Sequence, residues 1–135
     1  MIYFIYGEDS YRAKNKLEEI ILGYKKVHKS GLNLIYINAI EENFKDFYSN
    51  LKVSSMFAEK KLIVIKNSFS DLKFQEDFLE NIKNLGETKD IIIVYEDNAP
   101  DQRTKFFKTL LKVAKCQEFR FLQPAMLKKW VAQEL

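Results

Sequence analysis

Two uninterrupted apolar runs constrain the fold of this chain more than any other feature. Residues 62–65 read LIVI and residues 91–95 read IIIVY, so β-branched side chains dominate both runs. A strand with one face in water alternates apolar and polar residues, whereas a strand covered by helices on both faces does not. The two runs therefore predict neighbouring or near-central strands of a parallel sheet that is buried on both sides.

Three further short segments rich in β-branched or aromatic residues predict the remaining strands. They lie at residues 2–6, 32–37 and 118–122. Strand and helical patterns alternate along the chain, which is typical of a three-layer α/β/α domain with right-handed crossovers. We therefore expect a five-stranded parallel sheet, whose strand order the pattern does not reveal. Ligands of such open sheets usually bind beyond the carboxyl ends of the strands.

Between the expected strands, apolar residues recur at every third or fourth position, as on one face of an α-helix. The first pattern predicts a helix of about five turns, with Asp9 or Ser10 as its N-cap. Pro100 and Asp101 suit the start of a later helix. The expected apolar faces are Leu17, Ile20, Ile21, Tyr24 and Val27; Phe44, Phe47, Tyr48 and Leu51; Phe74, Phe78, Ile82 and Leu85; Phe106, Phe107, Leu110, Leu111 and Ala114; and Leu127, Trp130 and Val131.

The composition predicts one folded domain over residues 1–135. Apolar residues make up 47% and charged residues 30% of the chain, which suits a single core at this length. No apolar run approaches the roughly 20 residues of a membrane-spanning helix, and the N-terminus lacks a secretory signal pattern. The single cysteine, Cys116, is expected to be a buried small side chain in a reducing compartment. We therefore expect a soluble cytoplasmic protein with no membrane contact.

The turn after the first expected strand, residues 7–12, reads GEDSYR. A phosphate-binding loop needs several glycines, followed by a Lys and a Ser or Thr. This turn has one glycine, Gly7, and it carries Glu8 and Asp9, whose charges repel a phosphate. The sequence therefore predicts that no functional P-loop is present and that no nucleotide cofactor binds here.

Other candidate catalytic or metal-binding groups are few. His28 is the single histidine, so no histidine-based triad or metal cluster can be assembled around it. Its position suggests an exposed residue at the C-terminus of the first helix. Glu96 and Asp97 follow a central strand and are a candidate pair for catalysis or metal binding, although adjacent acids in loops are mostly solvated. We predict no catalytic residue and no metal site.

Met56 and Phe57 are adjacent apolar residues within the polar segment of residues 54–61, SSMFAEKK. Neither helical nor strand geometry easily directs two adjacent side chains into the same core. Two interpretations remain open on this pattern alone. The pair is either an exposed recognition patch or an anchor that ties a loop to the core.

Several segments together carry a resemblance to a known family in their order and spacing. They are residues 2–9 (IYFIYGED), 54–65 (SSMFAEKKLIVI), 91–96 (IIIVYE), 101–105 (DQRTK), 121–122 (FL) and 127–131 (LKKWV). Over essentially its whole length, the chain resembles the N-terminal domain of the delta subunit of the bacterial DNA polymerase III clamp loader.

The resemblance implies a domain like those of AAA+ and P-loop NTPases that has no nucleotide site and no enzymatic activity. It also implies binding and opening of the β sliding clamp during DNA replication, with Met56 and Phe57 as the clamp-contacting pair. Met in place of the family's usual Leu preserves volume. Clamp-binding peptides often carry a Gln ahead of this pair, where this chain has Lys52. Other loader subunits would be partners through a collar domain that, like the lid domain, is absent here, and DNA would be contacted indirectly.

Two other classes of function are weighed against this one. A divergent nucleotide-binding enzyme would need nucleotide affinity and an acidic magnesium site. A nucleic-acid-binding module would fit the aromatic content of 14% and the net charge of +3, but the aromatic residues fall on expected core faces, and Lys and Arg are not gathered on one face. Residues 101–105 could contact a neighbouring loader subunit or form a capped helix start.

Overall fold

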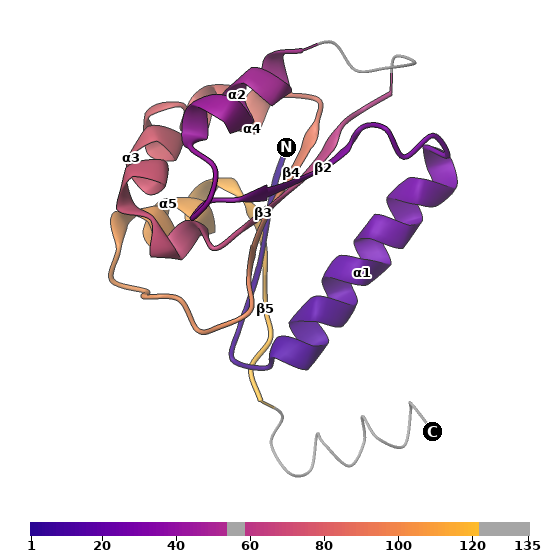
Figure 1. The fold of residues 1–135 in the computed structure, drawn as a ribbon. Coiled ribbons are helices and arrows are strands. Elements are labelled where there is room, and N and C mark those ends of the chain that lie inside the picture. The colour runs from indigo at the N-terminus through magenta and orange to yellow at the C-terminus, as the bar shows by residue number, and fades with distance from the viewer. Residues whose placement is uncertain (54–58, 122–135) are drawn as a thin grey trace, which may run out of the picture.

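The computed structural model describes residues 1–53 and 59–121, and within them the strands form one five-stranded sheet (Figure 1). All pairings are parallel, in the order β2-β3-β4-β1-β5. Helices cover both faces, which confirms the predicted three-layer α/β class. The strands are β1 (Ile2–Tyr6), β2 (Leu34–Asn38), β3 (Leu62–Lys66), β4 (Ile91–Glu96) and β5 (Lys115–Glu118).

The two continuous apolar runs form β3 and β4, which pair with each other near the centre of the sheet. Ile63 lies opposite Ile92, and Ile65 opposite Val94. All four side chains are fully buried. Alternate residues face the two helical layers, so neither face of these strands can carry polar side chains. The prediction of neighbouring buried strands is confirmed.

The helices are divided unequally between the two faces of the sheet. One helix, α1 (Ser10–Val27), covers one face, and the other described helices cover the opposite face (Figure 1). The chain crosses from β1 to β2 in one direction along the sheet, and all later crossovers run in the other direction. Because crossovers are right-handed, the two directions place their helices on opposite faces. The second layer contains α2 (Phe44–Lys52), η2 (Ser68–Ser70), α3 (Leu72–Glu80), α4 (Ile82–Glu87) and α5 (Lys105–Val113).

The first helix begins where the sequence predicts. The Asp9 side chain accepts a hydrogen bond from the backbone N–H of Arg12 at 3.2 Å, as an N-cap does. Leu17 and Tyr24 are buried as expected, but Val27 is 75% exposed. Eighteen residues of helix span about 27 Å, whereas a five-residue strand spans about 17 Å. The helix is therefore longer than the strand that precedes it, and the burial of its apolar face ends at Tyr24.

The last strand lies earlier in the chain than predicted. The sequence pattern placed it at residues 118–122, whereas β5 is Lys115–Glu118. This strand pairs with β1 alone, and its side chains are largely exposed. An edge strand can carry polar residues, so a pattern of apolar residues does not reveal it. Cys116 lies on it and is exposed, which corrects the expectation of a buried side chain.

Two helix boundaries also differ from the predictions. The helix expected at Pro100 and Asp101 begins at Lys105, because Asp101 bonds to Arg103 in a preceding turn and Thr104 caps the helix through the N–H of Phe107 at 3.1 Å. The helical pattern of residues 74–85 is broken at Asn81, which ends α3 and precedes α4. The helix expected from Leu127 onward lies outside the described residues.

Candidate functional site

The turn after β1 is closed by the chain segment that follows β5. Gly7 has φ +145°, and a Cβ atom added to it would lie 2.2 Å from the carbonyl oxygen of Phe119. That oxygen accepts a hydrogen bond from the N–H of Asp9 at 3.0 Å, and the N–H of Phe119 donates to the Tyr6 oxygen at 2.8 Å. The glycine therefore permits close backbone packing here and does not open a phosphate cradle.

Two of the amides at the start of α1 have acceptors within the protein. The N–H of Ser10 donates to the Glu8 oxygen at 3.1 Å, and the N–H of Arg12 donates to the Asp9 carboxylate. A helix N-terminus binds anions through such amides and through its dipole. Here the carboxylate of Asp9 already takes the place of the anion. An incoming phosphate would meet the same negative charge and would have to displace these bonds.

A hollow of about 340 Å³ lies beside this turn, at the carboxyl ends of β1 and β5. Its charged lining residues are Glu8, Glu118 and Arg120, and Arg120 pairs with Glu118 at 3.0 Å. The nearby Arg12 side chain donates to the backbone oxygen of Arg120 at 3.1 Å and lies 5.3 Å from the Phe119 ring. The cationic groups near the hollow are therefore engaged with the protein, and its charged lining residues are two acids and one arginine.

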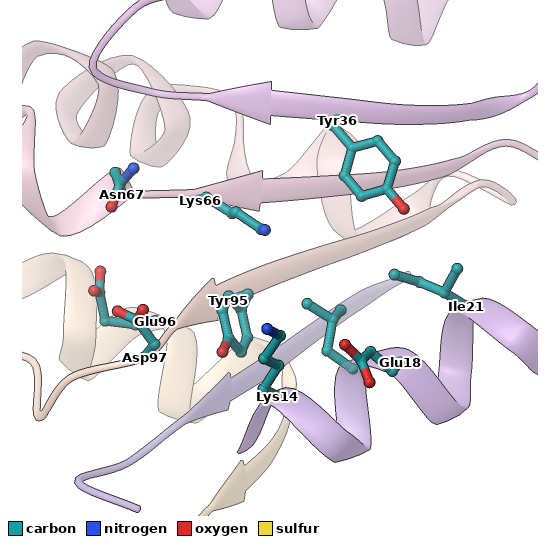
Figure 2. A pocket seen from close by; sticks show the side chains of 10 residues that line it. Lys14, Glu18, Ile21, Tyr36, Lys66, Asn67, Tyr95, Glu96 and Asp97 are labelled. Atoms are coloured by element: carbon teal, nitrogen blue, oxygen red, sulfur yellow. The ribbon is translucent and has the colours of Figure 1, made fainter. Parts of the chain in front are cut away.

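A second hollow, of about 350 Å³, lies between α1 and the carboxyl ends of β3 and β4. Figure 2 shows Lys14 and Glu18 of α1 on one side, with Lys66 and the end of β4 across from them. The charged residues that line this hollow are two lysines, Lys14 and Lys66, and three acids, Glu18, Glu96 and Asp97. Because the opposite charges nearly balance, the lining does not favour a polyanion such as a nucleotide.

Glu96 and Asp97, the candidate acid pair, occupy different environments. Glu96 is 7% exposed, and its Oε2 atom has no hydrogen-bond partner among the described residues, whereas Asp97 is exposed. Burial raises the pKa of Glu96, the charge of Asp97 raises it further, and the N–H of Phe69 opposes the rise through a hydrogen bond. In the described part of the chain, no group of three His, Cys, Asp or Glu residues could hold a metal ion.

The remaining candidates from the sequence have local structural roles. His28 is the C-cap residue of α1, as expected, but it is only half-exposed because its ring packs 4.6 Å from that of Tyr24. The Lys52 ammonium lies 4.5 Å from the Tyr48 ring. Asp101 and Arg103 form an exposed ion pair, which lowers the pKa of Asp101 through their hydrogen bonds.

Met56 and Phe57 lie outside the described residues, but the chain on both sides of them is described. The entry stem, residues 50–53, is the end of α2 and the residue after it. Lys61 is 4% exposed, and its ammonium donates to the backbone oxygens of Asn50 at 2.7 Å, Leu51 at 3.1 Å and Val53. The backbone N–H of Lys61 donates to the Asp90 carboxylate at 2.9 Å. One side chain thus joins the chain before the segment to the chain after it.

The exit stem, residues 59–61, has further partners. The Glu59 carboxylate accepts from the Ser30 hydroxyl at 2.8 Å and from the Asn33 amide at 3.1 Å. The Tyr24 hydroxyl of α1 donates to the backbone oxygen of Lys60. The sequence reasoning missed these anchors, because a Lys or Glu beside an apolar strand is ordinarily a solvated flank. Since both stems precede β3, they lie at the amino ends of the strands (Figure 1).

The aromatic side chains favour packing over stacking on bases. Phe4, Phe47, Phe74, Phe78 and Phe106 are among the largest fully buried residues. The last four rings contact one another in the layer that holds α2, α3 and α5, and Phe4 packs against Phe69 and Phe107. Buried rings cannot stack on a nucleic acid. In the described residues, no helix is long and apolar enough to span a bilayer.

Fold and site together define a three-layer α/β domain whose first turn is closed by its own chain. The family described as "DNA polymerase III, delta subunit" matches residues 3–120, and the chain belongs to this family. The fold is similar to that of the Bacillus subtilis DNA clamp loader delta protein (YqeN), with a TM-score of 0.66 and 14% sequence identity. The similarity covers 98% of this chain and 42% of that protein. No curated protein sequence matches the chain.

Proposed function

We propose that this chain is the N-terminal domain of a clamp-loader delta subunit that binds the β sliding clamp and helps to open it during DNA replication. The observation that carries the proposal is the family match over residues 3–120. The domain would act in the bacterial cytoplasm. Other loader subunits would join it through a collar domain outside this sequence, and DNA would be contacted indirectly through the assembled loader.

Met56 and Phe57 are proposed as the clamp-binding pair. Ser54, Ser55 and Glu59 flank them with polar groups, the pattern of an apolar wedge with a polar rim that is typical of an interface hot spot. The anchored stems support this proposal, because a segment held at both ends loses less conformational freedom when it binds. We expect the pair to enter an apolar pocket on the clamp.

We further propose that the domain uses no nucleotide of its own. The support is the internal bonding of the turn after β1, where Asp9 caps the helix and Phe119 packs against Gly7. The domain would therefore contribute a clamp-binding surface to the loader, and nucleotide hydrolysis would belong to other subunits. A divergent nucleotide-binding enzyme would need a phosphate site that these residues do not build.

Clamp binding can be tested with the purified chain and a purified bacterial sliding clamp immobilised on a biosensor surface. Phe57→Ala should weaken binding strongly while thermal unfolding stays unchanged. Leu72→Ala is a matched control, since Leu72 is also an apolar residue and is 69% exposed at the start of α3. Failure of the wild-type chain to bind the clamp would contradict the proposed function. Binding that survives Phe57→Ala would contradict the proposed site.

A further inference from the structure

The buried ammonium of Lys61 joins the two ends of the connection between α2 and β3. Lysine is rarely buried without a partner, because desolvating its charge is costly. Lys61 is 4% exposed and satisfies its ammonium with three backbone oxygens, those of Asn50, Leu51 and Val53. The last carbonyl groups of a helix lack intrahelical partners and carry its negative partial charge. Lys61 therefore stabilises the end of α2 from a position that lies after the connection.

The exit stem is held independently by α1 and by the loop before β2. Tyr24 is buried, and its hydroxyl donates to the backbone oxygen of Lys60. Glu59 bridges Ser30 and Asn33. These contacts hold the exit stem against the α1 layer, while Lys61 ties it to the end of α2 in the other layer. Both ends of the connection are thus fixed before any partner arrives.

We propose that Lys61 is a positioning residue for clamp binding, which it promotes by holding together the two ends of the segment that carries Met56 and Phe57. This role rests on the proposed function. Closing a loop costs entropy, and a segment whose ends are already fixed does not lose that entropy again on binding. If the ends separate, only a fraction of the molecules present the segment correctly, and the apparent Kd rises by the inverse of that fraction.

The neighbouring lysine provides a matched control for the experiment. Lys60 lies on the same stem and loses the same charge on substitution, but its side chain is exposed. Lys61→Met should weaken clamp binding by about tenfold, mainly through slower association, and Lys60→Met should change it by less than about twofold. Lys61→Arg keeps the cation and N–H donors and should restore most of the affinity.

A milder variant and a local measurement guard against a simple loss of folding. Tyr24→Phe keeps the ring in the core but removes the hydroxyl that holds Lys60, and should weaken binding by about two- to fivefold. Hydrogen exchange of the Val53 amide, which donates to Ser49 at 3.2 Å, should accelerate by about tenfold in Lys61→Met. The same amide should exchange at the wild-type rate in Lys60→Met.

The outcomes separate this role from the proposed function. If the wild-type chain does not bind the clamp, the proposed function and this role both fail. If it binds, and folded Lys61→Met binds equally well, the positioning role alone is wrong. An equal loss in Lys60→Met and Lys61→Met would show that charge alone matters, and would also overturn it. Should Lys61→Met not fold, unchanged binding by Tyr24→Phe would overturn the positioning role.

Discussion

The turn after β1 lies at the carboxyl ends of the strands, and the connection before β3 lies at their amino ends. The two regions differ in which groups their polar atoms bond. In the turn, the amides of Asp9 and Arg12 bond within the protein, and Phe119 packs against Gly7. In the connection, Lys61 uses its polar group to join the two stems on either side of Met56 and Phe57. The first arrangement fills the turn after β1, at the carboxyl ends of the strands, where α/β domains usually bind ligands. The second joins the two stems at the amino end of β3.

The usual ligand position of an α/β sheet and the proposed clamp contact lie in different parts of this chain. The N-terminus of α1 follows the carboxyl end of β1, and there the Asp9 carboxylate caps the helix while the segment after β5 packs against Gly7. The proposed clamp contact instead depends on a segment between α2 and β3. Each region can be altered without touching the other.

The largest effect is expected from Gly7→Ala. The new Cβ would lie 2.2 Å from a backbone oxygen, at φ +145°, so the variant should lose about 2–5 kcal/mol of folding free energy through overpacking and backbone strain. Chemical unfolding measures this loss. Gly23→Ala is the control, because its added Cβ would meet no atom within 4 Å outside its own stretch of α1, and it should gain about 0.5–1 kcal/mol. Equal stability of both variants would contradict the close packing of Phe119 on the turn.

Phe57→Ala should have the next largest effect, and on clamp binding instead of folding. We expect a loss of about 1–4 kcal/mol in binding free energy, with a smaller loss for Met56→Ala because Met has less area to desolvate. Folding free energy should change by less than about 0.5 kcal/mol. Isothermal calorimetry against the clamp and thermal unfolding measure the two quantities. A core anchor would show the reverse, with a folding loss of about 2–5 kcal/mol.

A smaller, pH-dependent effect is expected at Glu96. Burial raises its pKa in the folded state above the ordinary value of 4.5, so the protonated form is favoured by folding. This contribution is fully present below pH 4.5 and is lost as the pH rises through the folded-state pKa. Glu96→Gln should therefore gain stability relative to the wild type between pH 4 and pH 7. Urea midpoints at the two pH values test this, and a constant difference would argue against the burial of a charged group.

The smallest signal is expected from nucleotide binding. Calorimetry with ATP and magnesium should show no binding tighter than about 1 mM, equivalent to about −4 kcal/mol. The physical reason is the closed turn, where Asp9 occupies the helix N-terminus. Tighter binding would show that the turn after β1 still accepts a nucleotide, and would contradict its proposed difference from the connection before β3.

Features that depend on neighbouring residues could be predicted from the amino-acid pattern. The apolar runs of β3 and β4 have one stable placement, because a strand without polar positions must be covered on both faces. Asp9 caps α1 through an amide three residues away, and such a contact is local. The lack of glycines after Gly7 likewise predicts a turn that does not cradle a phosphate.

Features that join residues far apart in the chain could not be predicted, because they arise only when the elements pack together. Strand order, the edge position of β5 and the packing of Phe119 on Gly7 depend on crossovers that no local pattern encodes. The burial of Lys61 is of the same kind. A lysine in a polar segment looks solvated until the end of α2 brings Asn50 and Leu51 beside it. Carbonyl oxygens that lie unpaired at a helix end are visible only once the helix and the strand are placed together.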